Sequence, residues 1–180
     1  MNDRIKPVVV RAAVYIDGFN LYFGLRSKNW QKYYWLDMYK FSEFIAKQRQ
    51  LVSAKYFTAD VGGRRGKVQR QQSFLNALHT CAPKLDVIKG KFLNSTITCQ
   101  HCLQTFQKSE EKMTDVNIAT HLLHDAWKDT FDVAIIVSGD SDLIPPIEVI
   151  KNELGKQVLV AFPPRRMSNA LQQTGMLPKS

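Results

Sequence analysis

Short apolar runs alternate along this chain with longer amphipathic stretches. Four runs are rich in Val, Ile and Phe and almost continuously apolar, at residues 8–16, 52–58, 131–137 and 158–162. Such runs are typical of strands buried on both faces of a parallel sheet. Between them, helices are predicted at residues 41–48, 67–80, 114–128 and 145–154, with Gly155 ending the last one. The alternation predicts an α/β fold with a mainly parallel central sheet.

Residues 85–98 do not fit this pattern cleanly. Apolar and polar residues alternate over part of this stretch, which also contains Gly90. This pattern predicts a strand followed by an edge hairpin strand. We expect one domain over residues 1–172, with a small cysteine-containing hairpin insertion around residues 85–108. Residues 173–180 are expected to form a flexible tail.

The composition is that of a globular protein. The 180 residues are 44% apolar and 23% charged, which is enough apolar surface for a core and excludes a disordered chain. No apolar run approaches the roughly 20 residues that cross a bilayer. Arg11 interrupts the first run and Asp17 follows it where a signal peptide would be cleaved. We therefore expect a cytoplasmic protein with no membrane partner.

The charge balance narrows the class of partner. Lys and Arg number 25 against 16 Asp and Glu, for a formal net charge of +9. A polyanion is the natural partner of such a chain, and nucleic acid is favoured because no long basic amphipathic helix is present.

Aspartates follow the predicted strands at two places. Asp17 ends the first run, and Asp140 and Asp142 follow the run at 131–137. Because parallel strands share one carboxyl edge, where α/β proteins bind ligands, these side chains are expected to converge. Asp115 begins the helix predicted at 114–128 and lies on its apolar stripe, which makes it a fourth candidate.

Several carboxylates at one edge of a cationic protein favour a divalent cation. Oxygen ligands select Mg²⁺ or Mn²⁺, which activate water for phosphodiester cleavage. Each acid also has a structural alternative. Asp142 could cap the helix that contains Pro145 and Pro146, Asp17 could be a turn residue, and Asp115 could be an ordinary first-turn acid.

Three segments together resemble a known family. They are YIDGFNLY at residues 15–22, KMTDVNIATHLL at 112–123 and VSGDSDLIPPIE at 137–148. They are similar to the NYN (LabA-like) domains of the PIN-like nuclease superfamily. The resemblance implies a Rossmann-like three-layer α/β/α sandwich with a metal-dependent ribonuclease site. It also implies that Asp17, Asp115, Asp140 and Asp142 form the acidic cluster, with Asn20 and Ser138 in supporting positions.

The helix motif departs from the family pattern, which usually reads close to KGVDVALAVDLL. Here Met113 replaces the Gly and His121 replaces the second Asp. His121 could bind a softer ion such as Mn²⁺, contact phosphate, or lie exposed on the helix. The loss of an acid also leaves open a module that binds RNA without cutting it.

The three cysteines offer a second type of metal site. Cys99 and Cys102 form a CxxC pair, which is half of a structural zinc site by its spacing. Cys81 with His79 or His101 could complete it, and the alternative is a loop with free thiols.

Basic and aromatic residues suggest how RNA could be held. Cations that follow strands or precede the acidic helix could bind phosphates: Arg64, Arg65, Lys67, Arg70, Lys112, Arg165 and Arg166. Aromatic residues between Trp30 and Tyr39 could stack on bases or pack in a core.

These observations predict a metal-dependent endoribonuclease that hydrolyses RNA phosphodiester bonds with Mg²⁺ or Mn²⁺. The alternative is a non-catalytic RNA-binding or regulatory module that retains the nuclease fold. A homodimer is expected by analogy with other PIN-like proteins only.

Overall fold

The structure is a computed structural model that describes residues 9–63, 65–98 and 100–174. Six strands form one sheet in the order β4-β3-β2-β1-β5-β6. They are β1 (Arg11–Asp17), β2 (Gln50–Ala59), β3 (Leu85–Thr98), β4 (Thr105–Lys112), β5 (Val133–Val137) and β6 (Gln157–Ala161). All pairings are parallel except that of β4 with β3. The predicted α/β fold is confirmed.

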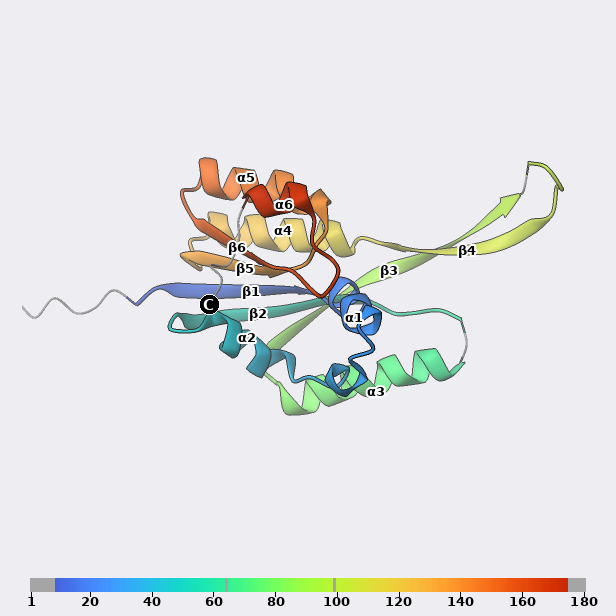
Figure 1. Ribbon diagram of the computed structural model, residues 1–180, viewed down its shortest axis with the longest axis horizontal. Coiled ribbons are helices and arrows are strands. Elements are labelled where there is room, and N and C mark those ends of the chain that lie inside the picture. Colours follow the sequence, from blue (N-terminus) through green and yellow to red (C-terminus); the bar gives the residue numbers. More distant parts are fainter. Residues whose placement is uncertain (1–8, 64, 99, 175–180) are drawn as a thin grey trace, which may run out of the picture.

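Helices cover both faces of the sheet (Figure 1). One face carries α1 (Gly18–Ser27), α2 (Met38–Ala46) and α3 (Arg65–Cys81), and the other carries α4 (Thr114–Trp127), α5 (Ile144–Asn152) and α6 (Asn169–Thr174). Short 3-10 turns lie at η1 (Gln31–Tyr33) and η2 (Ser141–Leu143). Strand residues alternate between two apolar cores, so that Tyr56 packs under α1 to α3 while Tyr15 packs under α4 and α5.

The pattern of apolar residues missed α1 and α6. The α1 sequence GFNLYFGLRS contains two glycines and three aromatic residues, which are weak helix formers. Asp17 starts this helix as its N-cap by accepting a hydrogen bond from the Asn20 amide. α6 continues through Thr174, two residues into the predicted tail, and residues 175–180 lie outside the described chain.

β3 is one continuous strand, which corrects the prediction of two strands at residues 85–98. Its first part, from Leu85 to Gly90, pairs with β2, and its second part, from Lys91 to Thr98, pairs only with β4. The second part therefore leaves the sheet with β4 as a two-stranded arm (Figure 1). Gly90 lies at the point of departure without interrupting the strand.

Within the described ranges, none of the helices is both long and apolar enough to span a membrane.

Candidate acidic site at the carboxyl edge of the sheet

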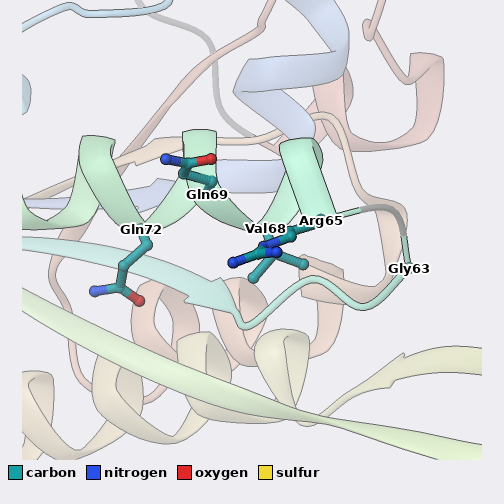
Figure 2. Close-up of a pocket in the computed structure, with 5 residues that line it drawn as sticks. All are labelled: Gly63, Arg65, Val68, Gln69 and Gln72. Carbon is teal, nitrogen blue, oxygen red and sulfur yellow. The ribbon is translucent and has the colours of Figure 1, made fainter.

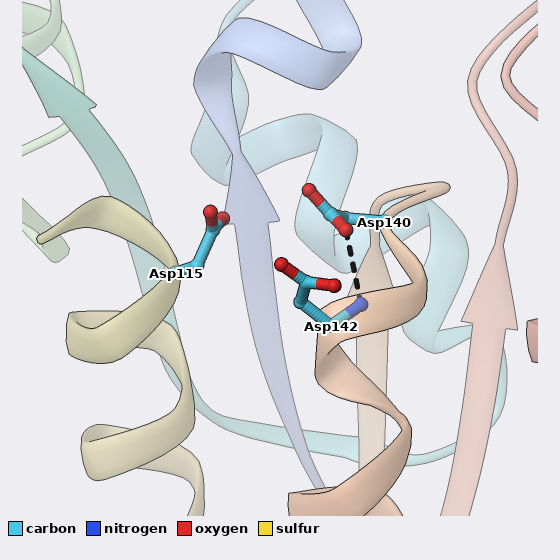
Figure 3. Close-up of side chains that lie close together, drawn as sticks. All are labelled: Asp115, Asp140 and Asp142. Atoms are coloured by element: carbon cyan, nitrogen blue, oxygen red, sulfur yellow. Dashed lines mark hydrogen bonds between the residues drawn. The ribbon is translucent and has the colours of Figure 1, made fainter. Parts of the chain in front are cut away.

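Three carboxylates meet beside the ends of β1 and β5 (Figure 3). One oxygen from each of Asp115, Asp140 and Asp142 lies within 4.8 Å of the others. Asp115 comes from the first turn of α4, whereas Asp140 is the last residue of the connection from β5 to η2 and Asp142 lies within η2. Asp115 and Asp140 are half-buried and Asp142 is exposed. The arrangement faces solvent and concentrates negative charge at one point.

The loop that carries two of these acids is held by its own hydrogen bonds. Asp140 is the N-cap of η2 and accepts a 3.0 Å hydrogen bond from the Asp142 amide. The Asp140 amide donates to Ser138 Oγ at 3.1 Å. Asp140 therefore caps η2, and Asp142 does not cap the helix that contains Pro145 and Pro146. α5 begins after Leu143 without a side-chain cap.

Asp17 lies apart from the group of three and is linked to it through Ser138. Its side chain is 4% exposed, and its two oxygens accept hydrogen bonds from the Asn20 amide at 2.9 Å and the Ser138 hydroxyl at 3.0 Å. Asn20 Oδ1 in turn accepts from the Gly139 amide at 3.2 Å. Asp17, Asn20 and Ser138 thus connect the end of β1 to the Asp140 loop.

Neighbouring elements approach Gly18 and Gly139 so closely that both positions require glycine. A Cβ on Gly18 would lie 2.5 Å from the Tyr56 ring, and a Cβ on Gly139 would lie 1.6 Å from the Arg166 carbonyl oxygen. Neither position has room for a side chain unless the neighbouring element moves. Gly139 consequently allows the loop after β6 to lie directly against the acidic loop.

His121 does not join the acidic cluster. It lies six residues beyond Asp115 on α4, about 9 Å along the helix axis. Its Nδ1 lies 3.4 Å from Lys55 Nζ, and its ring contacts Phe57 edge-on. Burial lowers the pKa of His121, and the neighbouring Lys55 ammonium lowers it further. The replacement of an acid by His121 therefore removes no oxygen from the group of three.

A buried polar group beside His121 was not found from the sequence. Asp125 accepts hydrogen bonds from the Tyr15 hydroxyl at 2.6 Å and from Lys55 Nζ. The Lys55 and Asp125 side chains are each 11% exposed. Burial raises the pKa of the Tyr15 phenol, and its hydrogen bond to Asp125 raises it further. The sequence did contain a signal for this buried pair: Lys55 lies within an apolar run, and Asp125 lies within an apolar helix.

The structure separates the residues proposed for zinc. Cys81 ends α3, shortly before β3 begins at Leu85, whereas Cys102 follows the far end of that strand. The 14 residues of β3 span more than about 40 Å at ~3.3 Å per residue. Cys81 and His79 therefore cannot share a tetrahedral site with Cys102 and His101. Cys99 lies outside the described residues.

Several of the predicted basic residues lie on the first turns of α3. Arg65 lines a hollow of about 590 Å³ beside Gly63, Val68, Gln69 and Gln72 (Figure 2). Lys67 and Arg70 line a second, larger cavity. Within the described chain, none of these three cations lies within 4.0 Å of a carboxylate oxygen, unlike Lys55, Lys89 and Lys156. Arg64 lies outside the described residues.

The remaining predicted cations lie on other elements near the same edge. The Arg166 guanidinium lies 5.7 Å from the centre of the Phe23 ring. Arg165 donates a hydrogen bond to the Ser27 carbonyl at 3.4 Å. Lys112 ends β4, two residues before α4 begins. The loop after β6 therefore brings two arginines against α1.

The fold and the site together define a class of protein. It is a three-layer α/β domain with carboxylates at the carboxyl edge of a parallel sheet. The NYN domain model matches residues 11–175, and the chain belongs to that family, which has a nuclease-like fold. The predicted NYN membership is confirmed.

The proteins that are similar to this chain include a curated relative and a solved structure. One is 6-hydroxy-3-succinoylpyridine 3-monooxygenase HspA from Pseudomonas putida, 27% identical over 91% of this chain, which spans 62% of that relative's length. The other is a crystal structure of a protein of unknown function from Vibrio parahaemolyticus. It has 23% identity and a TM-score of 0.62, and the match covers 94% of this chain and 91% of that one. The second likeness concerns the fold alone.

Proposed function

We propose that this chain is a metal-dependent endoribonuclease that hydrolyses RNA phosphodiester bonds at the acidic site. The observation that carries the proposal is the meeting of Asp115, Asp140 and Asp142 at the carboxyl edge of the sheet in a chain with a net charge of +9. A cationic protein attracts the polyanionic substrate, and the acids provide a local site for a divalent cation.

The donor set fits Mg²⁺ or Mn²⁺. All three donors are carboxylate oxygens, which are the ligands that hard divalent cations prefer. Ligand oxygens around an octahedral Mg²⁺ are about 3.0 Å apart when adjacent and about 4.2 Å apart when opposite, so oxygens within 4.8 Å of one another must draw closer together to bind one ion. A bound ion would lower the pKa of a water molecule and stabilise negative charge on the phosphate.

The other residues of the edge hold and orient these groups. The Ser138 hydroxyl donates to Asp17 and accepts from the Asp140 amide, so it fixes the acidic loop against the end of β1. Asn20 holds the same loop through Gly139. Lys67, Arg70 and Arg166 are proposed to bind phosphates on either side of the cleaved bond.

Cleavage of single-stranded RNA with added Mn²⁺ or Mg²⁺ tests the proposal. Asp140→Asn should lower the rate at least about 100-fold, because loss of a ligand should cost more than loss of an outer hydrogen bond. Asp60→Asn is the matched control, since Asp60 follows β2 and pairs with Lys89 outside the group of three. Equal rates for wild type and Asp140→Asn would refute the assignment.

Two other functions remain as candidates. A non-catalytic RNA-binding module would bind RNA, yet calorimetry with Mn²⁺ would detect no heat that depends on Asp115 or Asp140. The name of the Pseudomonas relative suggests a monooxygenase, a class that consumes O₂. A cavity lined by aromatic side chains favours that candidate, and oxygen uptake without metal-dependent RNA cleavage would support it.

A further inference from the structure

A cavity of about 1110 Å³ lies between α1, η1, the end of β2 and the start of α3. Its lining begins at Gly18, the residue directly after Asp17, so the cavity adjoins the β1 edge of the acidic site. Its volume exceeds the ~300–1000 Å³ of most small-molecule pockets. The cavity is therefore large enough for a segment of a polymer, and the chemistry of its wall decides between such a segment and a small molecule.

Aromatic rings form much of the cavity wall. On the α1 side, the Tyr22 ring lies 5.3 Å from Tyr34 and 5.4 Å from Phe23. On the α3 side, Trp35 and Phe74 lie 6.0 Å apart. Trp35 is 60% exposed and Tyr22 is 40% exposed, so each residue keeps surface that a ligand can contact. Flat, exposed rings are the surfaces on which nucleobases stack.

The polar part of the wall is cationic. Arg26, Lys67 and Arg70 line the cavity, and among its described lining residues there is no Asp or Glu. Rings combined with cations and without carboxylates match a ligand that alternates flat bases with negative phosphates. This combination distinguishes a nucleic acid strand from a purely apolar ligand.

We propose that this cavity binds unpaired bases of single-stranded RNA while the adjoining phosphodiester lies at the acidic site, an inference that rests on the proposed function. Tyr22 and Trp35 stack on bases, and Lys67 and Arg70 bind the phosphates between them. Gly18 in the lining follows Asp17, which Ser138 connects to the Asp140 loop, so the cavity and the acids lie at the same edge of the sheet. The site therefore selects strands whose bases are free to leave a helix.

Binding of a labelled oligouridylate, followed by fluorescence anisotropy with EDTA present, tests the proposal without cleavage. Trp35→Ala and Tyr22→Ala should each weaken binding about tenfold, since stacking contributes this much per base. An abasic oligomer of equal length should bind more weakly to the wild type and lose nothing further in either variant. Trp127→Ala is the matched control, because Trp127 is 79% exposed on α4, on the other face of the sheet.

Unchanged oligouridylate affinity in both variants would overturn the proposal. Equal losses for the abasic oligomer would also overturn it, as would displacement of oligouridylate by a hydroxypyridine carboxylate. If Asp140→Asn abolishes cleavage while Trp35→Ala and Tyr22→Ala bind normally, the base-binding proposal fails alone. If no RNA is cleaved while the base-dependent losses remain, the proposed nuclease function fails alone.

Discussion

Met113 has a backbone conformation that suits the glycine found at this position in the family motif. Its φ is +80°, in the left-handed region, and it directly precedes α4 and Asp115. For a residue with a Cβ this region costs roughly 1–2 kcal/mol. The departure from the family at Met113 therefore has a local energetic consequence beside the acidic site.

Met113→Gly is expected to stabilise the protein. Glycine removes the strain of the left-handed conformation, and this gain is larger than the free-energy cost of the extra conformational entropy in the unfolded chain. The free energy of unfolding should therefore rise by about 0.5–1 kcal/mol. Urea denaturation measures this difference. Val116→Gly, at an exposed position inside α4, should instead lose about 0.3–0.5 kcal/mol, because valine is itself a weaker helix former than alanine. A less stable Met113→Gly would contradict the strain argument.

His121 should make stability depend on pH. It faces Lys55 from β2, with Asp125 and His124 on α4 and Asp86 on β3 also nearby. Because its folded pKa lies below the ordinary 6.5, the unfolded chain binds the proton more readily. The His121 contribution is therefore complete above about pH 6.5 and is lost as pH falls towards the folded pKa.

His121→Gln should remove that part of the pH dependence. Unfolding free energies at a series of pH values from 7.5 to about 5 would show a shallower decline for the variant than for the wild type. Thr120→Gln, at an exposed position beside His121 on α4, is the control and should retain the wild-type decline. Parallel curves for wild type and His121→Gln would count against the proposed coupling to Lys55.

The β3–β4 arm is an element that adds little to the core. Residues from Lys91 onward on β3 pair with β4 and not with β2. Phe106 and Leu103 near the tip are 53% and 75% exposed. The sequence predicted a hairpin here, but periodicity reports only local alternation. It could not reveal that one strand continues from the sheet into the arm.

Shortening the arm should leave the body folded. Asn94 and Ser109 are directly paired, so replacing residues 95–108 with Asn-Gly would close the hairpin with a two-residue turn. The free energy of unfolding should change by less than about 1 kcal/mol, because few buried contacts are removed. Urea denaturation gives the value. A loss of several kcal/mol in the shortened chain, together with stabilisation of the full-length chain by added zinc, would instead indicate a structural metal at Cys99 and Cys102.

At the scale of the whole molecule, the positive net charge and the three clustered acids have opposite effects on RNA binding. The net charge of +9 attracts polyanions over the surface, while three acids repel phosphate at one point unless a cation is bound there. RNA binding in EDTA should therefore depend steeply on salt and weaken as the concentration rises.

Lys67→Gln combined with Arg70→Gln should reduce that dependence. Each lost phosphate contact lowers the slope of log K against log salt by about 0.7 for a single strand. Titrations at several KCl concentrations measure the slope. Lys128→Gln combined with Lys151→Gln is the matched control and should keep the wild-type slope, because Lys128 follows α4 and Lys151 lies on α5, both away from the cavity lining. Equal slopes for the cavity variant and wild type would exclude phosphate contacts at α3.

The sequence by itself determined the class of fold, the family and the residues able to carry the chemistry. Apolar runs define buried strands, and acids that follow parallel strands must lie at one edge, so Asp140 and Asp142 could be located there without coordinates. Tertiary structure decided which groups meet. Strand order and helix rise bring Asp115 to Asp140, leave Asp17 joined through Ser138, turn His121 to Lys55 and separate Cys81 from Cys102. Distances through space depend on packing between elements, which local periodicity does not encode.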